Sequence, residues 1–188
     1  MKTKRSSKVT KVVAMEIILL AVACAVVRAS VPSENQRPLN EQVRHELLMR
    51  PFLTVFDNIE YKVNGDMVTL QGQVTRPFLK SDAESAVKRI AGVSKVINNI
   101  EVLPQSSMDD QIRRAEFHTI YSGSGPLSRY GWGPIPSVHI IVNSGRVTLR
   151  GVVDTETDKN MATLFANQVF GVFSVQNDLT VAKPQINQ

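Results

Sequence analysis

The chain has 188 residues, 43% of them hydrophobic, which is enough for one medium domain or two small ones with packed cores. A formal charge of +5 and a pI near 9.5 suggest an anionic partner, either nucleic acid or membrane. The excess lies in residues 1–29, which hold six basic residues and one acidic residue. Residues 30–188 keep 16 of the 22 basic and 16 of the 17 acidic residues, so we expect no nucleic-acid partner.

Residues 1–29 have the order of a secretory signal peptide: a basic start, an apolar run at 12–27 and small residues at the end. The run is shorter than the roughly 20 apolar residues of a membrane-spanning helix, and Glu16 interrupts it. We therefore expect an exported protein with a flexible leader at 30–38. An uncleaved N-terminal anchor is one alternative, and a lipoprotein acylated at Cys24, the only cysteine, is another.

An internal repeat fills the rest of the chain. Residues 64–102 align with 143–181 without a gap, which matches VTLQG with VTLRG and GVSKVINNIEV with GVFSVQNDLTV. This alignment has an offset of 79 residues, whereas the starts of the two copies, NEQVR at 40–44 and DDQIR at 109–113, are only 69 residues apart. The copies therefore occupy 39–103 and 108–183, with a linker at 104–107, a tail at 184–188 and an insert at 121–137 in the second copy.

In the first copy we expect a helix at 40–50, capped by Asn40 and ended by Pro51. Alternating apolar residues then predict two strands, at 59–63 and 68–74, joined by an Asn-Gly turn. The stretch SDAE at 81–84 is typical of a capping box that starts a second helix. The stretch VINNIEV predicts a last strand, which gives the order α-β-β-α-β.

The second copy predicts the same order. Its first helix begins with Ser107 or Asp109 as the cap, and strands follow around 138–142 and 147–149. The second helix should bury one apolar face, and VQNDLTV forms the last strand. The residues expected on that face are Met161, Leu164, Phe165 and Val169.

Six residues recur in both copies and are expected to be structural. Glycine after the VTL strand allows close approach of a neighbouring backbone, and glycine after the second helix permits a left-handed C-cap. The asparagine of the last strand, if buried, must be hydrogen-bonded, and we expect it to tie down a neighbouring loop. These residues are Gly72, Gly92, Asn98, Gly151, Gly171 and Asn177.

The VTLxG strand followed by GVxxVxNxLxV resembles the BON domain of bacterial envelope proteins, and both copies carry the pattern. The resemblance implies an α+β fold: two tandem α-β-β-α-β units, each a small three-stranded mixed sheet with two helices on one face. It also implies a periplasmic or cell-envelope location. The implied role is non-catalytic binding of phospholipid or of another envelope protein, in envelope maintenance or osmotic stress.

The residues indicate neither an enzyme nor a cofactor. His45, His118 and His139 are not at metal-binding spacing, and the single cysteine lies in the signal. Asp109 and Asp110 could suggest a metal or acid–base pair, but they stand at a helix start, where capping is favoured. The glycines at 123–125 lack the following Lys-Ser/Thr of a phosphate loop.

The insert is the candidate contact surface. It contains the only tryptophan and two tyrosines beside an arginine, a composition that suits a membrane interface or a protein contact. The other interpretation is a loop that tucks its rings onto its own domain or the neighbouring copy. The residues concerned are Tyr121, Leu127, Arg129, Tyr130 and Trp132.

Overall fold

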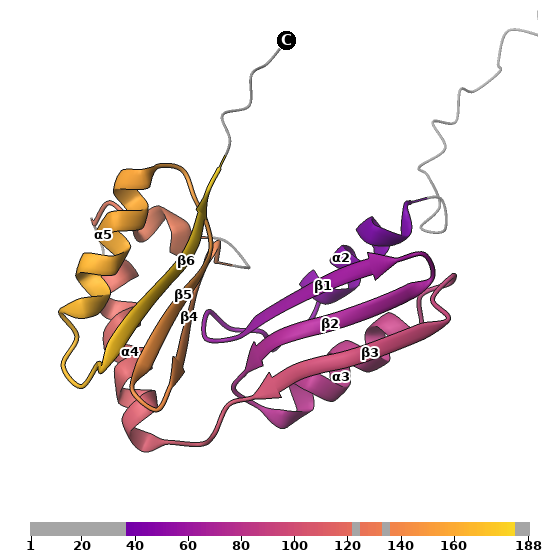
Figure 1. Cartoon of the computed structure of the whole chain (residues 1–188), viewed down its shortest axis with the longest axis horizontal. Coiled ribbons are helices and arrows are strands. Elements are labelled where there is room, and N and C mark those ends of the chain that lie inside the picture. Colours follow the sequence, from indigo (N-terminus) through magenta and orange to yellow (C-terminus); the bar gives the residue numbers. More distant parts are fainter. Residues whose placement is uncertain (1–36, 122–124, 133–135, 183–188) are drawn as a thin grey trace, which may run out of the picture. The chain divides into compact units, whose positions relative to one another are not determined.

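A computed structural model describes residues 37–121, 125–132 and 136–182 (Figure 1). The expected signal peptide, Cys24 and most of the leader lie outside these residues. Among the residues that are described, no helix is long and apolar enough to cross a membrane.

Both repeats have the expected α-β-β-α-β order. The first contains α2 (Leu39–Leu48), β1 (Asn58–Asn64), β2 (Met67–Val74), α3 (Pro77–Lys88) and β3 (Lys95–Val102). The second contains α4 (Ser107–Tyr121), a short 3-10 helix η2 (Ser128–Gly131), β4 (Val138–Asn143), β5 (Arg146–Val153), α5 (Glu156–Asn167) and β6 (Ser174–Val181). Part of the extra length of the second copy extends its first helix, which has 15 residues in α4 against 10 in α2.

Each repeat forms its own three-stranded mixed sheet, which confirms the expected fold class. The VTL strand is central: β2 is antiparallel to β1 and parallel to β3, and β5 has the same relation to β4 and β6. In the first repeat α2 packs against β1 and α3, and α3 packs against β2 and β3 (Figure 1). The helices therefore cover one face of each sheet.

The glycine of each central strand lies against the backbone of the neighbouring strand. Gly72 has a φ of 115°, and a Cβ built on it would be 2.1 Å from the carbonyl oxygen of Asn58. Gly151 has a φ of 126°, and its Cβ would be 2.0 Å from the carbonyl oxygen of Ser137. No real side chain tolerates such distances, so the repeated glycine allows a backbone approach that any other residue would block.

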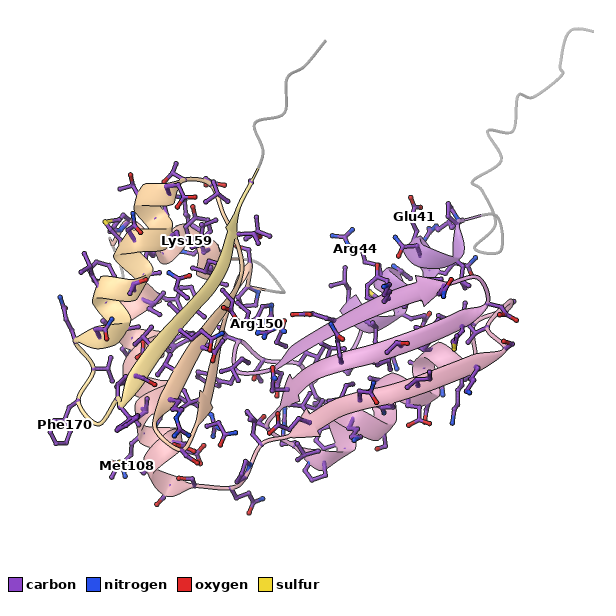
Figure 2. The ribbon with its side chains drawn as sticks, in the orientation of Figure 1. Glu41, Arg44, Met108, Arg150, Lys159 and Phe170 are labelled. Atoms are coloured by element: carbon purple, nitrogen blue, oxygen red, sulfur yellow. The ribbon has the colours of Figure 1, made fainter. Side chains whose placement is uncertain are left out.

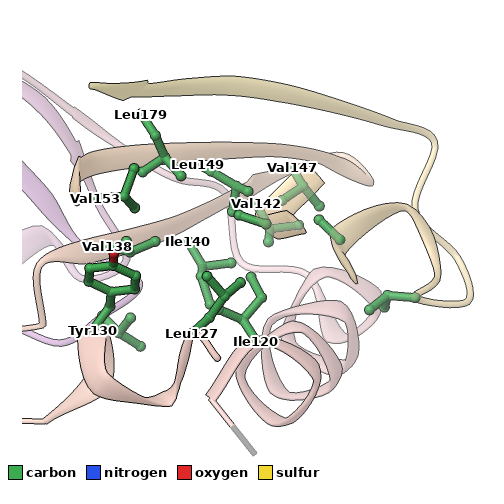
Figure 3. Close-up of a cluster of buried hydrophobic side chains, with 14 of the residues drawn as sticks. Ile120, Leu127, Tyr130, Val138, Ile140, Val142, Val147, Leu149, Val153 and Leu179 are labelled. Carbon is green, nitrogen blue, oxygen red and sulfur yellow. The ribbon is translucent and has the colours of Figure 1, made fainter. Parts of the chain in front are cut away.

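The second repeat has the larger core, and Figure 3 shows part of this cluster. Valines, isoleucines and leucines of β4, β5 and β6 meet Ile120 of α4 and two residues of the insert, Leu127 and Tyr130. The helix α5 contributes Ala162 and Ala166, which are buried. The expectation that Leu164 is buried is wrong, because it is 61% exposed: the two alanines form the contact face, and small side chains let the helix lie close to the sheet.

Three expected helix caps are wrong. The helix α2 begins at Leu39 rather than at Asn40, because the carbonyl group of Pro38 accepts hydrogen bonds from the first turn. The helix α3 begins at Pro77, which suits the first helical position, so Ser81 lies inside the helix. The α4 cap is Ser106, whose Oγ accepts a hydrogen bond from the N–H of Asp109 at 3.2 Å.

A loop of the first repeat contacts the second. Val55, which precedes β1, is buried in the core cluster of the second repeat, and its carbonyl oxygen accepts a hydrogen bond from the N–H of Ile140 at 2.8 Å. Arg150 of β5 forms an ion pair with Glu60 of β1 at 2.7 Å. The edge strand β4 is therefore partly covered by the loop of the other repeat at Ile140.

Replacing Gly72 by alanine should strongly destabilise the first repeat, because the new Cβ meets a backbone oxygen. We expect a loss of roughly 2–4 kcal/mol in the free energy of unfolding, measured by denaturant titration. Gly65→Ala is the matched control: its φ is also positive, at 62°, but no atom lies within 4 Å of its Cβ position. That variant should lose only about 1 kcal/mol, and equal losses would contradict the steric explanation.

Candidate functional site

Three residues of the insert fold onto their own domain. Leu127 and Tyr130 are buried in the second core, and Tyr121 ends α4 with its hydroxyl donating to the carbonyl oxygen of Val138 at 2.5 Å. Burial raises the pKa of Tyr121. These side chains hold the insert in place, and their rings are not offered to a ligand.

Arg129 and Tyr130 attach the insert to α5 through Asp158. The guanidinium of Arg129 donates to the Asp158 carboxylate at 2.6 Å, and the Tyr130 hydroxyl donates to it at 2.9 Å. Desolvation alone would raise the pKa of Asp158, but hydrogen bonds from Thr155 and Tyr130 and the charge of Arg129 lower it. Arg129 also pairs with Asp154 at 3.2 Å. Its charge is therefore engaged within the domain.

Trp132 has the one exposed ring among the five insert residues chosen from the sequence. It ends η2 and is 78% exposed. The insert thus anchors itself with two tyrosines and a leucine and presents a single tryptophan to solvent, where it can meet a membrane or a protein.

The repeated asparagines join a helix to a strand rather than to a loop. Asn98 donates to the carbonyl oxygen of Lys80 at 3.0 Å, and Asn177 donates to that of Lys159 at 2.7 Å. Gly92 and Gly171 have positive φ values of 93° and 88° but follow their helices by several residues, in the turns before β3 and β6. All four positions maintain the fold.

The largest exposed apolar group of the second repeat lies elsewhere, at the turn between α5 and β6. Phe170 is 96% exposed and Phe173 is 77% exposed. Met108, also exposed, lies beside this turn, and the guanidinium of Arg146 stacks over the Phe173 ring at 5.6 Å from its centroid. We call Met108, Arg146, Phe170 and Phe173 the aromatic end; Figure 2 shows Phe170 and Met108 projecting from the same end of the repeat.

Sequence reasoning missed the aromatic end, although the alignment of the two copies contains the signal. Phe170 stands opposite Ala91, and Phe173 stands opposite Ser94. The backbone at this turn is shared: Phe173 donates its N–H to the carbonyl oxygen of Gly145, as Ser94 does to Asp66. The second copy therefore keeps the turn and adds two rings that the fold does not need.

Asp109 neither caps α4 nor forms an acid–base pair. It is buried, and its carboxylate accepts hydrogen bonds from the backbone N–H groups of Ser144 at 2.9 Å and Gly145 at 2.8 Å. Asp110 forms an ion pair with Arg113 at 2.6 Å. Among the described residues, no group of three His, Cys, Asp or Glu side chains could hold a metal ion.

Two further buried carboxyl groups differ in how they are satisfied. Asp57 accepts hydrogen bonds from the backbone and hydroxyl groups of both Thr54 and Thr75, at 2.6–2.9 Å. Glu116 of α4 is fully buried, and neither carboxyl oxygen has a hydrogen-bond partner among the described residues. Burial raises the pKa of Glu116 to about 8, so the neutral acid is the favoured form in the folded protein at neutral pH.

The comparisons with known proteins identify the repeats. The BON domain family model matches residues 35–104 and 127–183, which together make up more than half of the chain. The chain is also 27% identical, over 124 residues, to the osmotically-inducible protein Y of Escherichia coli (strain K12). That alignment covers 65% of this chain and 61% of the relative, so the chain spans about three-fifths of the relative's length.

Two solved structures of CdsD, a structural protein of the type III secretion system of Chlamydia trachomatis, are also similar. Each is 13% identical to this chain; they cover 79% and 77% of it, and 99% and 93% of their own chains. Their TM-scores are 0.31 and 0.30, and at these values the similarity carries no inference about function.

Glu116 should make the protein less stable as pH rises. Its folded pKa of about 8 lies above the ordinary value of 4.5, so the folded state holds a proton that the unfolded state has lost. Between these two values stability should fall by up to about 1.4 kcal/mol per pH unit, levelling off above pH 8. Urea unfolding at several pH values should show a flatter profile for Glu116→Gln, whereas Glu101→Gln, an exposed residue of β3, should keep the wild-type slope.

Proposed function

Since the chain belongs to the BON domain family, we propose that it is a non-catalytic, exported module that binds phospholipid membrane surfaces in envelope maintenance or stress. Two tandem family domains follow a segment with the order of a signal peptide. The resemblance to a protein named as osmotically inducible supports a stress role. We propose that the chain resides in the periplasm or the cell envelope.

The aromatic end is the observation that carries this function. Phe170 and Phe173 stand almost fully in water, which is unfavourable unless the rings meet an apolar phase. Burying a phenylalanine side chain stabilises a complex by about 1.5–3 kcal/mol, so two rings suffice for reversible surface binding. Apart from the stacking of Arg146 on Phe173, no ring contact among the described residues involves either phenylalanine, and both replace small residues of the first copy.

The charge beside these rings favours anionic lipid. Arg146 stacks on Phe173 and forms no ion pair among the described residues, so its guanidinium is available to a lipid phosphate. A cation near the surface of an anionic membrane contributes about 1 kcal/mol. An aromatic ring with a guanidinium against it fits the boundary between acyl chains and headgroups.

Liposome flotation tests the proposal. The protein is purified after export, with its N-terminus established by mass spectrometry, and mixed with anionic or zwitterionic vesicles. Wild type should float with anionic vesicles, and Phe170→Ala/Phe173→Ala should bind at least about tenfold more weakly, because both rings are lost.

Two controls make this result specific. Phe52→Ala removes an exposed phenylalanine of the first repeat and should bind as wild type does. Trp132→Ala measures the contribution of the exposed insert ring. If neither vesicle type floats the wild type, or if the double variant floats as well as the wild type, membrane binding through the aromatic end is refuted.

The second candidate function is a protein adaptor within an envelope assembly, favoured by the exposed ring of Trp132 beside Arg129 and Tyr130, which Asp158 holds in place. Rigid aromatic anchors of this kind are common at the centre of protein interfaces. Pull-down from envelope extract with wild type and Trp132→Ala separates the two functions. A specific partner that is lost with Trp132→Ala, together with no flotation, would favour the adaptor.

A further inference from the structure

A cavity of about 670 Å³ lies where β2 and β3 end and α4 begins. The register of the first sheet brings the two sides of the cavity together. Val74 pairs with Val102, and the N–H of Leu103 donates to the carbonyl oxygen of Val74. Thr75 and Arg76 therefore lie beside the linker that leads into α4. The volume of the cavity is within the usual range for small-molecule sites.

Three arginines line the cavity, against one carboxylate. Arg113 is only 5% exposed and is fixed by Asp110 at 2.6 Å and by the carbonyl oxygen of Val142 at 2.7 Å, while its Nε has no hydrogen-bond partner among the described residues. Arg76 donates to the carbonyl oxygen of Phe52 but forms no ion pair within the described ranges. Arg114 forms neither a hydrogen bond nor an ion pair there. Arg76 also stacks over the Phe78 ring, with its guanidinium carbon 5.0 Å from the ring centroid. The charges of Arg76 and Arg114 are therefore not matched by a carboxylate within the described ranges.

The first turn of α4 adds backbone donors. Its cap, Ser106, accepts hydrogen bonds from Asp109 and Asp110, whereas the N–H groups of Ser107 and Met108 have no acceptor in the part of the chain that is described. Ser106 and Ser107 line the cavity. The positive end of a 15-residue helix thus faces the same space as the arginines, and such helix ends favour anions.

We propose that this cavity binds a phosphomonoester-type anion, carried either by a lipid headgroup or by a soluble small molecule. Planar guanidinium groups match the oxygens of phosphate, and a dianion would balance the charges of Arg76 and Arg114, neither of which has a carboxylate partner among the described residues. Neither Phe170 nor Phe173 lines the cavity, so the inference goes beyond the membrane contact proposed for these two rings.

Isothermal titration calorimetry at low ionic strength tests the site with inorganic phosphate and with glycerol 3-phosphate as probes. Arg114→Ala removes an exposed side chain that has no partner in the described part of the chain, so the fold should be kept. Its affinity for either probe should fall by about tenfold or more. The matched control is Arg89→Ala, an exposed arginine at the end of α3, which removes the same charge outside the cavity and should change affinity less than about twofold.

Flotation with vesicles containing phosphatidic acid separates the two sources of phosphate. Saturable binding of soluble probes that depends on Arg114 assigns a soluble ligand. If soluble probes do not bind, but Arg114→Ala and not Arg89→Ala weakens flotation, the ligand is a headgroup. Neither effect, or equal effects in both variants, overturns the proposal.

The double variant of the aromatic end keeps the two proposals distinguishable. Phe170→Ala/Phe173→Ala should retain wild-type affinity for inorganic phosphate, because neither ring lines the cavity. Loss of phosphate binding in that variant would contradict a separate site, whereas loss of flotation alone concerns only the proposed membrane function.

Discussion

The whole architecture depends on one close contact, made twice. In each repeat a glycine of the central strand lies where any Cβ would strike a carbonyl oxygen of the neighbouring strand. Because the glycine has no side chain, the antiparallel pair keeps its register through this point, and the same strand pairs in parallel with the last strand on its other side. The helix between these two strands packs on the sheet that the pairings form.

The repeats share this scaffold and differ in what they add to it. The asparagine of each last strand holds the crossover helix through the same lysine carbonyl group, Lys80 or Lys159. The second copy adds an insert, of which Leu127 and Tyr130 are buried in its own core, and two phenylalanines at a turn that both copies share. The exposed residues that distinguish the second copy therefore stand on elements that both copies share.

The sequence was sufficient for the element order and the mixed sheets, because period-two apolar patterns and a long gapless repeat are strong signals. The helix starts were less predictable. Pro38 and Pro77 start their helices through backbone geometry, and the nearby Asn40 and Ser81 only resembled caps. The burial of Leu164 was overestimated because an amphipathic pattern does not tell whether leucines or alanines face the sheet.

The candidate contact surface was the least predictable feature. The composition of the insert suggested a contact surface, but an aromatic-rich loop can bury its rings as readily as expose them. The hydroxyl groups of Tyr121 and Tyr130 instead donate hydrogen bonds within the domain, to Val138 and Asp158. Phe170 and Phe173 looked like ordinary repeat residues. Only the comparison of equivalent positions with Ala91 and Ser94, together with their exposure, distinguishes them.

Asp109 has a consequence for communication within the second repeat. From the first turn of α4 it holds the Ser144–Gly145 turn, and the carbonyl oxygen of Gly145 accepts the N–H of Phe173. A ligand that shifts the start of α4 would therefore shift the exposed ring through two sets of backbone hydrogen bonds. Linkage makes such coupling reciprocal: an anion that changes membrane affinity by some factor has its own affinity changed by the same factor at the membrane.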